Sequence, residues 1–594
     1  MNYPVWYLPS VGGGLLIALI AVTHVFVSHF AVGGGLYLVL AERKGLREQN
    51  RGIIDFTRRH AKFFLLMTMV YGSLTGVGIW FIIGLVNPQA TSLMIHTFVF
   101  GWATEYVFFL LEIVSLVVYY YTFDRLDPQT HQLVGWIYFI SAWLSLFLIT
   151  GIIGFMLTPG AWPADHNFWS AFFNPGFWPA VVFRTFVAGM FAGVYAFLTT
   201  AFLKDRTLKK KMTRYSGQWV LYSLIGTIPS GYWYLTTVPQ KARVLLDGGA
   251  SPTIQRSLVF GFYALIVLAV LTLIFTLIMP KLHNEAVAVF IFVCAFIFMG
   301  AFEWTREAAR RPYVINGVMY TTQIRPDQMA QIDHDGFLHS ARWSAIKEIH
   351  PDSMTQAGEE IFKFQCYACH TIGGFNNDII GRTRTMSFPT MLKYLKSVHK
   401  LRYFMPPFAG TDQEMKALAT YVIGSLQGKS VAVAATSAGT ANPGHDLFKA
   451  HCTLCHPQNL VKSRTAGWSL AKIRKALDNL NGLIPAMPNY DGTPKQKDLI
   501  AGYIHSLNAP GASAAPSHEP GEDVFEEHCA MCHGLRTGGN PVLPLVKGWS
   551  RKRIRGALDR LSKLNPAMPD LDAPPAQKDQ LADFLHHESQ RGTK

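Results

Sequence analysis

A pattern of two cysteines followed by a histidine occurs three times in the C-terminal half of the chain. The copies are Cys366-Tyr-Ala-Cys369-His370, Cys452-Thr-Leu-Cys455-His456 and Cys529-Ala-Met-Cys532-His533. Two thiols at this spacing can each add to one vinyl group of a haem, and the adjacent histidine can supply an axial nitrogen to the iron. A redox disulfide or a zinc site would need a second Cys or His pair at a fixed offset, and none follows. The sequence therefore predicts three covalent haems c.

Each motif lies in a repeat that also contains a Met-Pro segment. Met405, Met487 and Met568 follow their histidines at similar distances, and a thioether opposite an imidazole raises the potential of a haem. Because of this order, each repeat resembles a small class I cytochrome c, with the methionine as second axial ligand. We expect three such domains, separated by Ala-, Ser-, Gly- and Pro-rich linkers, at residues 355–428, 441–509 and 518–588.

The first half of this 594-residue chain is strongly apolar. About eight runs are long enough to cross a hydrocarbon core of roughly 30 Å, near residues 12–41, 61–87, 92–123, 132–158, 180–203, 216–237, 256–279 and 286–306. No basic residue precedes the first run, so we expect it to remain as a membrane anchor. The predicted fold is mostly α: a helical membrane bundle at 1–306, a connector at 307–354 and three all-α cytochrome c domains.

The loops predict how the bundle is oriented. Arginine and lysine are concentrated at 43–59 and 204–214, which should therefore face the cytoplasm, whereas 159–179 has neither residue. An even number of spans then places both termini outside, where c-type haem is attached. We expect a multi-pass protein of the bacterial inner membrane with its cytochrome c domains in the periplasm. The net charge of +15 is partly topogenic and does not indicate nucleic-acid binding. The basic runs at 472–475 and 551–555 have two interpretations, a surface that favours an acidic electron-transfer partner and, the preferred one, solvated helix faces.

Several ionisable residues fall within or next to the apolar runs. Charged or polar groups at membrane depth are costly and are functional candidates by default. They are His24, His29, Glu105, Glu112 and Arg184, with Glu307 at the outer boundary.

The sequence around these groups resembles the large subunit of cytochrome bd oxygen reductases over about residues 12–318. The similar segments, in order, are Thr23-His24 with Gly33-Gly-Gly35, then Phe108-Phe-Leu-Leu-Glu112, Phe123-Asp-Arg-Leu126, His131, Trp136 and Ser145, then Phe173-Asn-Pro175 with Phe183-Arg-Thr185, and Glu307-Ala-Ala-Arg310-Arg-Pro312. The resemblance implies one or more non-covalent membrane haems, a high-spin haem b or a haem d, with His24 and Glu307 as axial ligands and Arg310 closing the pocket. It also implies a proton path from the cytoplasm through Glu112 and Ser145, with Glu105 nearby and Asp124 and His131 at its mouth.

Two departures from that family concern the electron donor. Where the family has a histidine that binds its low-spin haem b, this chain has Arg184, and a guanidinium has no lone pair for iron. The outer segment at 238–255 is shorter than the quinol-binding loop of the family. The family also has nine spans where about eight are expected here.

These features indicate membrane electron transfer but leave its direction open. The first hypothesis is an oxygen reductase supplied by cytochrome c or another electron carrier through the three haems c. The second is a quinol-to-cytochrome c oxidoreductase, and the third is a non-catalytic electron-conducting subunit of a larger respiratory complex. Each would work in a lipid membrane, with a second membrane subunit or as a homo-oligomer.

Overall fold

The protein is described by a computed structural model that covers residues 3–246, 252–374, 377–431, 443–452, 458–480, 490, 492–508, 521–522, 524–525, 529, 542–561, 571 and 573–591. Contacts group the chain into two units. The first comprises Met1–Met386 and Tyr394–Lys429, and the second comprises Ser387–Lys393 and Ser430–Lys594. Each unit is considered by itself.

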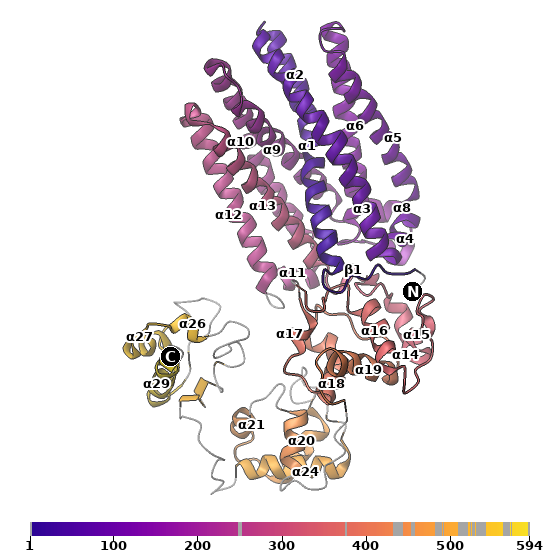
Figure 1. The fold of residues 1–594 in the computed structure, drawn as a ribbon, viewed down its shortest axis with the longest axis vertical. Coiled ribbons are helices and arrows are strands. Elements are labelled where there is room, and N and C mark those ends of the chain that lie inside the picture. The colour runs from indigo at the N-terminus through magenta and orange to yellow at the C-terminus, as the bar shows by residue number, and fades with distance from the viewer. Residues whose placement is uncertain are drawn as a thin grey trace. The chain divides into compact units, whose positions relative to one another are not determined.

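Long helices form the bundle of the first unit (Figure 1). Its elements are α1 Gly13–Arg47, α2 Arg51–Leu65, the π-helix η1 Leu66–Gly72, α3 Ser73–Val86, α4 Pro88–Thr97, α5 Val99–Tyr121, α6 Pro128–Gly154, α7 Trp162–Asp165, α8 Phe168–Phe172, α9 Phe177–Ala201, α10 Arg206–Thr236, α11 Gln240–Leu246, α12 Pro252–Thr272, the π-helix η2 Leu273–Ile278, the 3-10 helix η3 Pro280–Leu282 and α13 Glu285–Ala309. Figure 1 shows α1 beginning and α13 ending at the same end of this bundle.

Seven helical stretches of the described chain are long and apolar enough to cross a membrane. They are Gly13–Arg47, Arg51–Val86, Val99–Tyr121, Pro128–Gly154, Phe177–Ala201, Ile254–Ile278 and Glu285–Ala309. The further span expected near 216–237 lies in α10, which is long enough but carries a basic N-terminal part and an internal proline, Pro229. The run expected at 92–123 is interrupted, because Phe98 leaves the helical conformation between α4 and α5.

Polar caps define where several of these helices begin. Asp127 accepts hydrogen bonds from the backbone N–H groups of Gln129 and Thr130 at the start of α6, and Asp205 does the same for α10. Asn284 caps α13 in the same way. Side-chain oxygens accept hydrogen bonds from amide groups that the start of a helix leaves unpaired. These residues therefore fix the starts of α6, α10 and α13, at the end of the bundle opposite the C-terminal end of α13.

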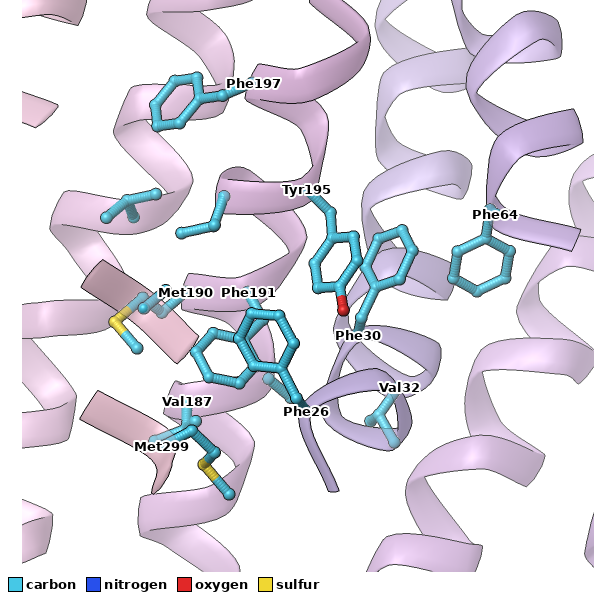
Figure 2. Packing of buried hydrophobic residues seen from close by; sticks show 14 of the residues in the cluster. Phe26, Phe30, Val32, Phe64, Val187, Met190, Phe191, Tyr195, Phe197 and Met299 are labelled. Atoms are coloured by element: carbon cyan, nitrogen blue, oxygen red, sulfur yellow. The ribbon is translucent and has the colours of Figure 1, made fainter. Parts of the chain in front are cut away.

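Aromatic side chains from α1 and α9 fill the centre of the bundle (Figure 2). The rings of Phe30 and Tyr195 stack with centroids 3.8 Å apart, and Phe26 meets Phe191 edge-on at 4.7 Å. The two helices approach so closely that a Cβ added to Gly33 would overlap the carbonyl oxygen of Ala188. This packing holds α1 and α9, which carry His24, His29 and Arg184, in a fixed register.

The connector after α13 is ordered and contacts the adjacent end of the bundle. It contains the antiparallel strands β1 Tyr313–Ile315 and β2 Met319–Tyr320, the 3-10 helix η4 Pro326–Gln328, and the helices α14 Met329–Asp335 and α15 Phe337–Ser340. The backbone N–H of Asn316 donates to the Met156 carbonyl at 2.9 Å, and the Gln323 side chain accepts from the Gln89 N–H at 2.8 Å. The connector is therefore anchored by the bundle.

Short helices make up the three C-terminal repeats. They are α16 Met354–Gln365, α17 Ile379–Thr383, α18 Phe388–Leu401, α19 Asp412–Ala419 and the π-helix η5 Thr420–Ser425; then α20 Pro443–His451, α21 Gln458–Arg464, α22 Leu470–Asp478 and α24 Pro494–Leu507; then α26 Val542–Val546, α27 Arg551–Leu558 and α29 Pro575–Arg591. An aromatic pair packs within each repeat: Phe362–Tyr421, Phe448–Tyr503 and Phe525–Phe584.

The basic runs of the second and third repeats are paired within their own domains. Arg474 contacts Asp478 at 2.7 Å and Asp498 at 2.6 Å. Arg555 occupies the corresponding place and contacts Asp559 and Asp579 at 2.5 and 2.9 Å. These arginines thus lie on ion-paired helix faces.

Candidate haem sites

The first Cys-x-x-Cys-His motif forms a tight turn at the end of α16. The N–H of Cys366 donates to the carbonyl of Phe362 at 2.8 Å, and the N–H of His370 donates to the carbonyl of Cys366 at 2.9 Å. Neither Cys366 nor Cys369 is in a disulfide, and burial raises the pKa of the Cys366 thiol to about 12. Two free thiols and one imidazole are therefore presented together on a single turn.

Hydrogen bonds set His370 in the form that an iron ligand needs. Its Nδ1 lies 3.2 Å from the carbonyl oxygen of Asn377, to which it can only donate, so Nε2 keeps its lone pair. Asn377 is held in turn, because its side-chain amide donates to the Cys369 carbonyl at 2.6 Å. Burial lowers the pKa of His370 to about 4, which keeps the imidazole neutral. The residues fit a covalent haem c.

Met405 lies in the loop that follows α18. The hydroxyl of Tyr394 donates to its sulfur at 3.6 Å, and Nδ1 of His399 donates to its backbone carbonyl at 2.7 Å. Tyr394 and His399 were not predicted from the sequence, because neither belongs to a recognisable motif. Their contacts orient the thioether that is predicted to be the second ligand of the first haem.

The first cysteines of the other two motifs are placed in the same way as Cys366. The N–H of Cys452 donates to the carbonyl of Phe448 at 2.7 Å, and that of Cys529 donates to the carbonyl of Phe525 at 2.8 Å. The other predicted ligands of these repeats lie outside the described residues: Cys455, His456, Met487, Cys532, His533 and Met568.

In the bundle, His24 on α1 is also set for metal binding. Its Nδ1 lies 3.1 Å from Oγ1 of Thr75, which donates its own proton to the Tyr71 carbonyl at 2.8 Å or the Gly72 carbonyl at 3.1 Å. Nδ1 of His24 must therefore be the donor, and Nε2 carries the lone pair. No described residue hydrogen-bonds to Nε2. Thr75 lies in the first turn of α3, which follows the π-helix η1, a type of distortion that is frequent at functional sites.

His29, on the same helix, has hydrogen-bond partners at both ring nitrogens. Its Nδ1 donates to the Val25 carbonyl at 2.8 Å, so Nε2 accepts from Nη1 of Arg184 at 3.3 Å. Nη2 of Arg184 donates to Oε1 of Glu303 at 3.1 Å, and Arg306 pairs with the other oxygen of Glu303 at 2.8 Å. Arg184 is thus held in a buried ion network with His29, Glu303 and Arg306.

Glu303 was missed by the sequence reasoning, which singled out Glu307. The two lie one turn apart, and Glu303-Trp-Thr-Arg306 repeats the Glu-x-x-Arg spacing of Glu307-Ala-Ala-Arg310. The Glu307 side chain is 49% exposed and pairs with Arg310, whereas the Glu303 side chain is 7% exposed. Glu307 and Arg310 remain predicted members of the haem pocket, while the repeated spacing would have indicated Glu303.

A cavity of about 250 Å³ lies between α9, α10, α12 and α13. Its walls are almost entirely apolar, and its polar members Thr227 and Thr305 bond to carbonyls of their own helices. Arg306 also lines it and is paired with Glu303. The described lining contains no His, Met or Cys, so it offers no axial ligand and does not fit a low-spin haem.

The three residues of the predicted proton path lie close together. Oγ of Ser145 donates to Oε1 of Glu105 at 2.7 Å. Glu112 is buried, and its Oε1 has no hydrogen-bond partner among the described residues. Ser145 and Glu105 therefore form a pair beside Glu112, which presents a buried carboxylate oxygen for a further hydrogen-bond partner.

A second buried cluster lies where the path was expected to begin. Nδ1 of His131 contacts Oε1 of Glu42 at 2.7 Å, and the hydroxyl of Tyr119 donates to Oε2 of Glu42 at 2.8 Å. Asp124 forms ion pairs with Arg51 and Arg58, and the hydrogen bond from Arg51 lowers the pKa of Asp124. Glu42 was not predicted, because in the sequence it belongs to the basic end of a helix.

The bundle is apolar and helical, and His24 within it has a free ring nitrogen. The C-terminal half contains three haem-attachment motifs. These features define a multi-pass membrane protein of haem-based electron transfer. Residues 15–244 match the family model of cytochrome bd terminal oxidase subunit I. Residues 353–422, 439–504 and 516–585 each match cytochrome c oxidase, cbb3-type, subunit III. Residues 15–244 are therefore similar to cytochrome bd terminal oxidase subunit I, and three cytochrome c domains follow them.

Among solved structures, the chain is similar to bd oxidase from Geobacillus thermodenitrificans. The identity is 17%, the match covers 52% of this chain and 90% of that chain, and the TM-score is 0.45. No curated protein matches the chain. The two family matches identify a haem-dependent respiratory oxidoreductase with covalent haem c and membrane haem.

Proposed function

We propose that this protein is an oxygen reductase that receives electrons from cytochrome c through its three haems c. The observation that carries the proposal is the ion network of Arg184, which donates to His29 at 3.3 Å and to Glu303 at 3.1 Å. It leaves no ligand at the position of the low-spin haem through which the related oxidases accept electrons from quinol. The fused cytochrome c domains would supply the electrons that a low-spin haem supplies in the related oxidases.

The residues would divide the work as follows. His24 would hold a membrane haem through Nε2, with Glu307 as a further ligand and Arg310 beside it. When bound, that haem supplies the site of oxygen reduction. Glu105, Ser145 and Glu112 would bring protons from the inner side, past Asp124, His131 and Glu42. The cytochrome c domains would lie in the periplasm of a bacterial cell, where c-type haem is attached.

Side chains exposed on α3 and α5 give the protein a surface for further membrane contacts. Leu74, Val77 and Phe81 on α3 and Phe100 and Val107 on α5 are all at least half exposed. Apolar residues that project from a membrane bundle contact lipid or another membrane protein. We propose a second membrane subunit or a second copy of this chain as the additional partner.

The apolar cavity between α10, α12 and α13 favours one second candidate, a quinol-to-cytochrome c oxidoreductase, since a long apolar molecule with a polar end fits its lining. Oxygen uptake by the purified complex with reduced cytochrome c, and separately with a reduced quinol, distinguishes the two. Faster uptake with cytochrome c is expected. Uptake with quinol alone would contradict the proposal, and quinol-dependent reduction of cytochrome c without oxygen uptake would establish the second candidate. Inactivity with both donors at full haem content, with any partner subunit retained, would point to a non-catalytic electron-conducting subunit.

A further inference from the structure

The N-terminal segment before α1 lies against the first haem-attachment turn. The backbone N–H of Leu8 donates to the hydroxyl of Tyr367 at 3.1 Å, and the N–H of Ile372 donates to the carbonyl of Pro9 at 2.8 Å. The ring of Tyr7 meets that of Tyr367 edge-on with centroids 5.0 Å apart. Tyr367 stands between the two haem-binding cysteines, so these contacts reach the attachment turn itself.

The two segments fit so closely that glycine is needed on both sides. Gly12 has a φ of +77°, and a Cβ there would lie 2.8 Å from Cγ2 of Thr371. A Cβ on Gly374 would overlap the carbonyl oxygen of Ser10. Real Cβ atoms do not approach other atoms so closely, so a side chain at either position must push the segments apart.

The same domain is also held from the connector. The N–H groups of Phe337 and Leu338 donate to the carboxylate of Glu414 at 2.9 and 2.7 Å. That carboxylate is buried and additionally accepts from the N–H of Thr411 at 2.8 Å. The first cytochrome c domain is thus held at several places, and the N-terminal contact is the one of these that reaches the haem-attachment turn.

We propose that Tyr7–Gly12 form a docking seat that holds the first haem-attachment turn at the outer end of α1 and sets the distance of electron transfer. The seat continues directly into α1, where His24 lies about 16 Å further along the axis at about 1.5 Å per residue. Haem bonded to Cys366 and Cys369 is tied to the turn that touches the seat. The transfer moves one electron and no atoms, so the donor iron becomes ferric as the acceptor iron becomes ferrous. This inference rests on the proposed function for its direction only.

The test uses the full chain with its haems and any partner subunit retained. Gly12→Ala places a methyl group against Thr371, whereas the matched control Gly14→Ala places one at 3.6 Å from the Ala368 carbonyl, an ordinary contact. Tyr367→Phe removes the acceptor for Leu8 and serves if Gly12→Ala does not fold. Two quantities are measured: amide hydrogen exchange of Leu8 and Ile372, and the rate of electron exchange between haem c and membrane haem after rapid mixing.

We expect slow amide exchange in the wild type and faster exchange in Gly12→Ala. Electron exchange should slow, because the rate of electron transfer falls as the distance between donor and acceptor haem grows. Haem content and haem potentials should stay unchanged, and Gly14→Ala should match the wild type. Equal electron-exchange rates in Gly12→Ala and Gly14→Ala, or unprotected Leu8 and Ile372 amides in the wild type, would overturn the seat. Normal electron exchange without oxygen uptake would contradict the proposed function and leave the seat standing.

Discussion

Removing the carboxylate of Glu303 should destabilise the bundle more than removing the guanidinium of Arg184. Glu303 is the single anion between two cations, with Arg184 at 3.1 Å and Arg306 at 2.8 Å, and their side chains are 7%, 5% and 16% exposed. Glu303→Gln leaves two buried guanidinium groups without their counter-ion, which should cost about 3–5 kcal/mol. Arg184→Met leaves Glu303 paired with Arg306 and removes only charge-assisted hydrogen bonds, worth about 1.5–3 kcal/mol.

A double variant tests the same ion network. Arg184→Met combined with Glu303→Gln leaves only one unpaired cation, so it should be more stable than Glu303→Gln alone. Thermal unfolding of the purified complex in detergent, followed by tryptophan fluorescence, measures the order. Glu285→Gln is the control, because Glu285 is exposed on the same helix and should change stability by less than about 0.5 kcal/mol. A double variant less stable than Glu303→Gln, or equal effects of the two single variants, would refute the network.

Three further outcomes are expected. Intact-mass measurement should find three covalent haem additions per chain, and two or fewer would contradict the three-motif reading. His24→Ala should lose a non-covalent haem that His29→Ala retains, since only His24 has a free Nε2; pyridine haemochrome analysis measures both, and the opposite result would reject His24 as a ligand. Met405→Ala should lower the potential of the first haem c, because the thioether ligand raises it, with Tyr394→Phe changing it less; a redox titration that finds no shift for Met405→Ala would exclude this methionine.

Local patterns in the sequence predicted much of the fold and of the haem c sites. Apolar runs indicated the membrane helices, since each run must satisfy its backbone groups within one helix. The haem-attachment turn could also be predicted, because the backbone hydrogen bond between Cys366 and His370 lies within the motif itself. The break at Phe98 was missed, because apolar residues continue on both sides of it and hydropathy alone does not mark a bend.

Contacts between distant helices could not be predicted in the same way. Arg184 and Glu303 lie on α9 and α13, and Glu42 and His131 lie on α1 and α6. Each residue was visible as a charge, but its partner depends on how the helices pack. Glu112 and Ser145 were expected at similar depth, and the structure adds a pairing that the sequence did not indicate, between Ser145 and Glu105. Helix rotation decides such pairings, and a single sequence contains no direct measure of it.

Helix α1 connects the two chemistries that the proposed function needs. The docking seat lies just before its first residue, His24 follows about 16 Å further on, and Glu42 lies about 27 Å beyond His24 at about 1.5 Å per residue. Electrons would therefore arrive at one end of this helix and protons at the other, with the iron ligand between them. Such an arrangement works only if the helix cannot slide, and the close crossing of Gly33 with α9 prevents sliding. The same crossing holds His29 against Arg184, so this buried ion network also fixes the helix that carries the proposed ligand His24.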